Sequence, residues 1–195
     1  MIPKQYSCIL LTLAVVIPVW SQEPASPFPA EDKAQLFVDQ VLVRETQGIS
    51  FTLHPAREHP ENPLVKADQP WEGWRLELYG NVIHDEEDGL FKMWYLGEET
   101  ETFPNYAVYY AESQDGVHWE KPLIGTVQTD TYPSHNVVAA EIILPSVIKD
   151  NTEPDPEKRY KMIGWDQKRH GYHTWVSPDG LHWNPFSQEP LCRGG

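Results

Sequence analysis

The chain has 195 residues and a formal net charge of −14. This charge argues against nucleic acid or an anionic membrane surface as a partner, because both select for basic patches. Aromatic residues make up 12% of the chain, and 18 prolines and 12 glycines indicate many turns, so an all-β protein is favoured over a helical bundle.

The first 21 residues have the three parts of a secretory signal peptide. Lys4 supplies the positive charge, residues 9–19 form an apolar stretch, and Ser21 offers a small residue for cleavage before Gln22. The apolar stretch is shorter than the roughly 20 residues that a membrane-spanning helix needs. We therefore expect no membrane span after cleavage and a secreted or periplasmic location.

Residues 22–35 are rich in proline and polar side chains, which predicts a linker. The next segment, residues 36–43, is a strong β-forming run that Asp39 interrupts. A carboxylate within such a run either lies on a solvated face or turns inward for a purpose. Residues 49–54 alternate apolar and polar side chains, which predicts a half-buried strand, and the prolines of residues 55–73 predict a loop.

A seven-residue phrase occurs twice in the chain. It runs from Ser113 to Trp119 and again from Ser177 to Trp183, so the two copies lie 64 residues apart. Each copy contains Asp-Gly, the dipeptide that best tolerates the positive φ angles of a type I′ turn, and therefore predicts a hairpin tip. The spacing suits one blade of a propeller with a long insertion.

The similarity between the two copies extends upstream of the turn. Lys92-Met93 and Lys161-Met162 each follow an aromatic residue in a short strand-like run, and a second strand rich in aromatic residues comes next. We therefore predict two units, at about residues 79–122 and 147–187. In the first unit, residues 118–121 are the expected outer strand, and residues 129–143 are the expected connection to the second unit.

These residues resemble the five-bladed β-propeller glycosidase superfamily, which includes invertases, levansucrases, arabinanases, xylosidases and mannoside phosphorylases. More narrowly, the chain is similar to secreted, planctomycete-type proteins described as glycosyl hydrolase family 32 N-terminal domain. The shared segments are Leu-Phe-Val-Asp, Lys-Met-Trp-Tyr and the two Asp-Gly-x-x-Trp hairpins, at residues 36–39, 92–95, 110–119 and 177–183. The resemblance covers residues 36–195 and implies an all-β propeller, of which this N-terminal fragment holds about two blades.

The resemblance implies catalytic carboxylates on the inner strands around a central funnel. Asp150 follows Val-Ile-Lys, which partly matches the Arg-Asp-Pro segment of invertase-like enzymes; the alternative is a plain turn aspartate. The Asn-Asp-Pro segment of these enzymes is absent, and Glu77 is the carboxylate nearest its expected place. Asp39 and Asp85 compete for that role. The proton-donor glutamate is expected in a later blade, beyond residue 195.

Four further residues are candidates for sugar binding. Trp71 and Trp74 flank a glutamate and could form a stacking platform, or else pack in the core. Asn81 and Asn136 could bind sugar hydroxyls, or else serve as turn residues. The histidine spacing matches no zinc site, so no bound metal is expected.

Two classes of function remain open at this stage. The first is a secreted glycoside hydrolase-like protein that acts on extracellular poly- or oligosaccharides without a cofactor. The second is a non-catalytic propeller that binds carbohydrate or assembles a surface complex, which the missing Asn-Asp-Pro favours. In both cases the expected partner is carbohydrate, and the sequence specifies neither the glycan nor the choice between hydrolysis, phosphorolysis and binding.

Overall fold

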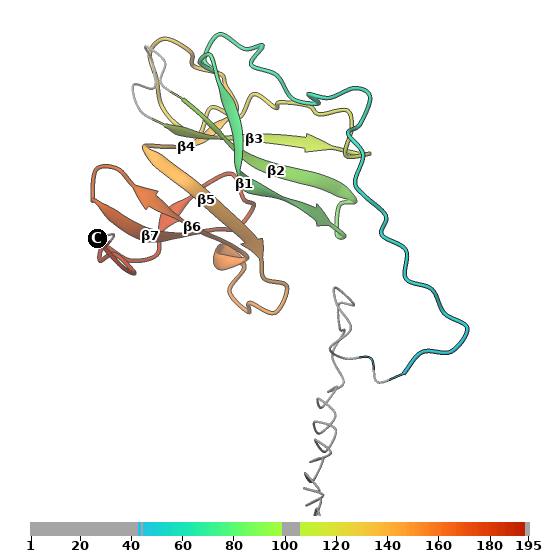
Figure 1. Cartoon of the computed structure of the whole chain (residues 1–195). Helices are drawn as coiled ribbons and strands as arrows, with labels where there is room; N and C mark the ends of the chain where they lie inside the picture. The colour runs from blue at the N-terminus through green and yellow to red at the C-terminus, as the bar shows by residue number, and fades with distance from the viewer. Residues whose placement is uncertain (1–42, 44, 99–105, 194–195) are drawn as a thin grey trace, which may run out of the picture. The chain divides into compact units, whose positions relative to one another are not determined.

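The computed structural model describes residues 43, 45–98 and 106–193 (Figure 1). The chain divides into two compact units, residues 1–56 and residues 57–195. The signal-like segment, the expected linker and the expected strand at residues 36–43 with Asp39 fall on residues outside this description, apart from residue 43. In the described part of the chain, no helix is long and apolar enough to cross a membrane.

The described residues of the first unit contain no helix or strand. The strand expected at residues 49–54 therefore does not form, and Ile49, Phe51 and Leu53 are exposed. An alternating pattern yields a strand only where another strand offers hydrogen bonds, and the described residues provide none here.

The second unit consists of two four-stranded antiparallel sheets, and its only helical element among the described residues is the 3₁₀ turn η1. In both sheets the strands follow one another in chain order. Sheet 1 contains β1 (Leu76–Asp85), β2 (Leu90–Gly97), β3 (Ala107–Ser113) and β4 (Val137–Ala140). Sheet 2 contains β5 (Ile142–Lys149), β6 (Tyr160–Asp166), β7 (Gly171–Ser177) and β8 (Asn184–Pro185), with η1 (Pro156–Lys158) before β6. The chain is thus all-β, as the sequence predicts.

The outer strand of sheet 1 differs from the sequence prediction. β3 pairs with β4, within the segment predicted to be a connection, whereas residues 118–121 form a single bridge between Glu112 and Glu120. Pro122 has no backbone N–H to donate to a ladder, which limits a strand at this point. Val137 and its neighbours are buried and supply the apolar edge that β3 needs.

The two Asp-Gly segments are turns, but they are not type I′ turns. The φ angles of Gly116 and Gly180 are +76° and +80°, whereas neither preceding aspartate has a positive φ. Instead, the Asp115 carboxylate accepts hydrogen bonds from the N–H groups of Val117 and His118 at 2.8 Å, and Ser113 Oγ accepts from Gly116 N. The second copy repeats these bonds. Side chains therefore satisfy the turn's N–H groups, so a tight hairpin is not required.

The two sheets pack against each other through one apolar core. Trp94 and Tyr110 of sheet 1 belong to the same buried cluster as Met162 and Trp175 of sheet 2. The Trp94 indole N–H also donates a hydrogen bond of 2.8 Å to the Gly180 carbonyl. Each sheet alone would expose this apolar face, so packing the sheets together stabilises both.

The first strands of the two sheets, β1 and β5, lie side by side and run in the same direction (Figure 1). The Asn81 side chain on β1 donates to the Val147 carbonyl and accepts from the Val147 N–H, both at 2.7 Å. Asn81 therefore acts as a structural link between the two sheets, and its amide is occupied within the protein.

Candidate functional site

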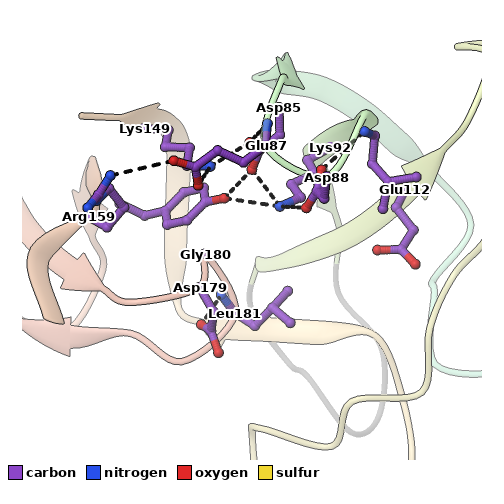
Figure 2. Close-up of polar contacts among 12 residues, drawn as sticks. Asp85, Glu87, Asp88, Lys92, Glu112, Lys149, Arg159, Asp179, Gly180 and Leu181 are labelled. Atoms are coloured by element: carbon purple, nitrogen blue, oxygen red, sulfur yellow. Dashed lines mark hydrogen bonds and ion pairs between the residues drawn. The ribbon is translucent and has the colours of Figure 1, made fainter. Parts of the chain in front are cut away.

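A buried carboxylate lies where β1 ends against sheet 2. The Asp85 side chain accepts hydrogen bonds from Lys92 at 2.7 Å and from the Tyr160 hydroxyl at 2.6 Å, and it also accepts one from Lys149 (Figure 2). Lys92 comes from sheet 1, whereas Lys149 and Tyr160 come from sheet 2. We call these four residues the Asp85 cluster. It lines a cavity of about 260 Å³.

The hydrogen bonds of the Asp85 cluster keep Asp85 and Lys92 in their charged forms. Burial alone would raise the pKa of Asp85, but the hydrogen bonds from Lys149, Lys92 and Tyr160 outweigh it and hold this pKa well below the usual range. Burial would likewise lower the pKa of Lys92, yet its bonds to Asp85 and Asp88 raise it. Because Asp85 stays ionised with both oxygens bonded, it has no proton to donate and no free oxygen to attack a substrate.

A second polar network fixes the loop before β1 onto sheet 1. The fully buried Glu72 accepts hydrogen bonds of 2.6 Å from both the Tyr95 hydroxyl and the Lys121 ammonium group. Asn136 accepts from the Trp71 indole at 2.8 Å and donates to the Tyr95 hydroxyl at 2.7 Å. Burial raises the pKa of Tyr95, so its hydroxyl keeps its proton. The predicted sugar-binding residues Trp71 and Asn136 thus have their polar groups occupied inside the protein.

The beginning of β1 presents a different set of side chains to solvent. Trp74 is 76% exposed, and the Arg75 guanidinium lies 5.8 Å from the centre of its indole ring. Arg75 also pairs with Glu77 and with Glu98, the latter at 3.0 Å. We call Trp74, Arg75, Glu77 and Glu98 the entry cluster. Glu77 lines an adjoining cavity of about 470 Å³ together with Trp119.

The entry cluster contains two of the residues that the sequence singled out, Trp74 and Glu77. An exposed indole can stack on a sugar ring, and a carboxylate that lines a cavity can accept hydrogen bonds from hydroxyls. Here Glu77 lines the cavity, and Arg75 contacts both Glu77 and Trp74. The two tryptophans do not share a platform, since Trp71 is buried whereas Trp74 is exposed. The Trp74 ring is therefore open to a ligand, and Glu77 lines the neighbouring cavity while it pairs with Arg75.

Asp150 lies far from the entry cluster. It follows the end of β5, where it pairs with Lys161 at 2.7 Å and accepts a hydrogen bond of 2.7 Å from the Thr152 hydroxyl. The bond from Lys161 lowers the pKa of Asp150. Thus Asp150 is held as an ionised turn residue at the opposite end of the inner strands.

The spacing of the inner strands separates Glu77 from Asp150. Asn81 contacts Val147, Glu77 precedes Asn81 by four residues, and Asp150 follows Val147 by three. β1 is irregular between Glu77 and Asn81, which lie opposite Leu96 and Trp94, only two positions apart on β2. At about 3.3 Å per residue, the two carboxylates are therefore on the order of 15–20 Å apart. Glycosidase carboxylate pairs lie about 5–10 Å apart. The structure therefore does not bring Glu77 and Asp150 together as an acid and nucleophile, and Asp39 lies outside the described residues.

The sequence prediction gave Asp85 only as a competitor for a catalytic role and missed Glu72. The repeat contains a signal for the Asp85 cluster. In both units an acidic residue is followed three positions later by a second acidic residue, and then by a lysine. These residues are Asp85, Asp88 and Lys92 in the first unit and Asp150, Glu153 and Lys161 in the second. No comparable repeat marks Glu72. The described residues contain no group of three or more His, Cys, Asp or Glu side chains suited to a metal ion.

Comparisons with known proteins give partial matches. No family model matches the chain. Two uncharacterized proteins of Mycobacterium tuberculosis, MT1551 and Rv1502, are each 39% identical over 147 residues, which is 65% of this chain. The chain thus spans 44% of the length of these relatives.

Solved structures with a similar arrangement include two enzymes named for fructans or fructosides. A fructofuranosidase of Schwanniomyces occidentalis is 17% identical, with a TM-score of 0.46 over 64% of this chain and 25% of its own. The fructan 1-exohydrolase IIa of Cichorium intybus is 16% identical, with a TM-score of 0.41 over 69% of this chain and 25% of its own. Each match spans a quarter of the enzyme's chain.

Proposed function

We propose that this chain is part of an exported, carbohydrate-active β-propeller of the glycosidase superfamily, and that the entry cluster faces the sugar. The observation that carries this proposal is the exposed Trp74, which contacts Arg75, together with Glu77, which pairs with Arg75 and lines a cavity of about 470 Å³ at the start of an inner strand. The propeller is supported by two sheets of the same strand order whose first strands lie side by side. Closure with five blades belongs to the same proposal.

The proposed reaction is the hydrolysis of an extracellular poly- or oligosaccharide. Glu77 would supply one carboxylate, and Trp74 would hold a sugar ring against it. The second carboxylate would come from another part of the whole protein, because Asp85 is fully bonded and Asp150 lies on the order of 15–20 Å from Glu77.

A screen of oligosaccharides tests this proposal. The whole protein that contains this chain is purified and mixed with fructan, arabinan, xylan and mannan oligosaccharides, and both product formation and binding are measured. We expect Trp74→Ala to weaken binding about tenfold or more through loss of stacking, and Glu77→Gln to reduce turnover. Phe186→Ala, which removes an exposed aromatic ring from sheet 2, is the matched control. Equal loss in all three variants would contradict a site at the entry cluster.

The second candidate function is carbohydrate binding without catalysis. It is favoured by the separation of Glu77 from Asp150 and by the ion pairs that occupy Asp150. Binding that depends on Trp74, with no product from any glycan, would decide for this candidate.

Export is a separate part of the proposal, supported by the signal-like residues 1–21. Expression of the unprocessed chain in a bacterial host, followed by fractionation, tests it. We expect the chain outside the cytoplasm with Gln22 as its first residue. An uncleaved chain in the cytoplasm would contradict export.

A further inference from the structure

One arginine joins the aromatic ring and the acidic side chains of the entry cluster. The Arg75 guanidinium lies 5.8 Å from the centre of the Trp74 ring, and it pairs with both Glu77 and Glu98. In the described part of the chain, no other cation pairs with either glutamate. The arrangement of the cluster therefore depends on Arg75.

The strand register places Arg75 between its two acidic partners. β1 begins at Leu76, which lies opposite Gly97, the last residue of β2. Arg75 and Glu98 are the next cross-strand neighbours, and the Glu98 N–H donates a hydrogen bond of 3.3 Å to the Arg75 carbonyl. Side chains two residues apart on a strand lie on the same face of the sheet, which brings Glu77 to the Arg75 side chain.

The two glutamates are held more firmly than the arginine between them. The Glu98 carboxylate also accepts a hydrogen bond of 3.3 Å from the Tyr106 hydroxyl. The side chains of Glu77 and Glu98 are 16% and 13% exposed, whereas that of Arg75 is 47% exposed. A long exposed side chain has many rotamers, and ion pairs to two fixed carboxylates select one of them.

A second arginine makes contacts of the same kind in sheet 2. Arg169 pairs with Asp166 at 2.7 Å, and its guanidinium lies 5.5 Å from the centre of the Trp175 ring. The Trp175 ring belongs to the apolar core, so the contact of Arg169 serves packing. Trp74 lies mostly in solvent, so burial does not account for the fixed position of its ring.

The charges of the entry cluster leave no cation free for an acidic ligand. Arg75 carries one positive charge, whereas Glu77 and Glu98 carry two negative charges together. Among the described residues that line the cavity of about 470 Å³, Glu77 is the only charged one. A carboxylate or sulfate group would therefore meet a net negative charge, whereas sugar hydroxyls can donate hydrogen bonds to Glu77.

We propose that Arg75 is the positioning residue of the entry cluster: it holds the Trp74 ring and the Glu77 carboxylate in the arrangement that receives a sugar, and Glu98 holds Arg75. Because both glutamates occupy the guanidinium, the cluster selects glycans without acidic groups and rejects uronates and sulfated sugars. This inference rests on the proposed function, which it deepens by naming the class of substrate. Arg75 acts through Trp74 and Glu77 and needs no contact with the sugar.

The first experiment observes the Trp74 ring without any glycan. The whole protein that contains this chain is labelled with fluorotryptophan, and the Trp74 resonance in its fluorine NMR spectrum is the one that Trp74→Phe removes. We expect Arg75→Met to shift this resonance and to leave the urea midpoint nearly unchanged, because partly exposed ion pairs contribute little to stability. Arg169→Met is the matched control and should lower the urea midpoint without moving the Trp74 resonance. An unmoved resonance in Arg75→Met would overturn the positioning role.

The second experiment measures the binding of neutral and acidic oligosaccharides to the same protein. The neutral set is the fructan, arabinan, xylan and mannan of the screen, and the acidic set is mannuronan, galacturonan and glucuronoxylan oligosaccharides. We expect Arg75→Met to weaken neutral binding about two- to fivefold, because the Trp74 ring loses its cation–π contact. Acidic oligosaccharides should bind at least about tenfold more weakly than neutral ones, because like charges repel across the site.

Two charge variants separate the local charge from the total charge of the chain. Glu98→Gln neutralises the cluster and should raise the affinity for the acidic set about threefold. Glu86→Gln removes the same charge from an exposed residue just beyond the opposite end of β1 and should cause no such gain. Equal gains in both variants, or an acidic glycan that binds through Trp74 as tightly as a neutral one, would overturn the selectivity and leave the proposed function standing. If no glycan binds at all, the proposed function and the selectivity both fail, whereas the Trp74 resonance still decides the positioning role.

Discussion

Sheet 1 and sheet 2 each contain a lysine that pairs with two acidic side chains, Lys92 with Asp85 and Asp88, and Lys161 with Asp150 and Glu153. The surroundings of these residues differ between the two sheets. In sheet 1 the lysine and aspartate are covered by the next sheet and gain two further partners. In sheet 2 they remain partly exposed. The comparison shows that the same ion pairs respond differently to mutation: removing one partner of the buried copy leaves a charge without its partner, whereas the exposed copy contributes little to stability.

The largest expected effect comes from breaking the buried copy. Asp85→Asn leaves Lys92 and Lys149 with a neutral partner, and removing one member of a buried ion pair costs about 3–5 kcal/mol. Urea denaturation of the purified chain measures the free energy of unfolding. Asp150→Asn is the matched control and should produce no resolved change in the same chain. If both variants lose equal stability, the two copies do not differ as the structure indicates.

The next effect concerns the repeated glycine of the two turns. Gly180→Ala and Gly116→Ala carry the same cost of placing a side chain at positive φ, about 1 kcal/mol. A Cβ atom at Gly180 would also lie 2.7 Å from the Trp94 ring, whereas one at Gly116 would lie 3.8 Å from Phe91. We expect Gly180→Ala to cost a further 1–3 kcal/mol, approximately, through overpacking. Thermal denaturation of the two variants measures the difference, and equal melting temperatures would contradict it.

A smaller effect is expected from the phenol that completes the Asp85 cluster. Tyr160→Phe removes hydrogen bonds to Asp85 and from Lys92, at 2.6 Å and 3.0 Å. The aromatic ring is kept, so the loss should be about 1.5–3 kcal/mol, the range for hydrogen bonds to charged groups. Tyr79→Phe, on an exposed part of β1, should leave the unfolding free energy unchanged in the same titration. A Tyr160→Phe variant as stable as the Tyr79→Phe variant would show that the Tyr160 hydroxyl does not contribute to the free energy of unfolding.

The smallest effect is a dependence on acid pH. The folded pKa of Asp85 lies below its ordinary value of 3.8, so its stabilising contribution is present above that value and is lost as the pH falls through the folded pKa. Each unit of pH below the ordinary value should remove at most about 1.4 kcal/mol through this group. Asp85→Asn should flatten this part of the pH profile. An unchanged slope in the variant would assign the acid sensitivity to other carboxylates.

The sequence predicted the repeated part of the fold and missed what depends on distant contacts. The repeated phrase and the Lys-Met strands predicted the units that became β2, β3, β6 and β7, because turns and alternation are local signals. The outer strand of sheet 1 was assigned to residues 118–121, and the structure places it at Val137–Ala140. That choice is made by pairing with β3 and by burial, neither of which a local pattern records.

The candidate site was predicted only in part for a similar reason. Exposed Trp74 and buried Trp71 are three residues apart and look alike in the sequence, and only the packing of the loop on sheet 1 separates them. Asn81 and Asn136 carry the amide group that a sugar site needs, yet that group is equally suited to backbone and side-chain partners within the protein. Whether a polar side chain meets a ligand or the protein is decided by the fold.

The link made by Asn81 has a consequence for the free edges of the two sheets. β1 and β5 are edge strands, and exposed backbone groups on such strands invite pairing with another strand. By offering one donor and one acceptor to Val147, the amide imitates a peptide group without extending the ladder. It keeps the two sheets as separate neighbours, where direct pairing would fuse them into a single continuous sheet.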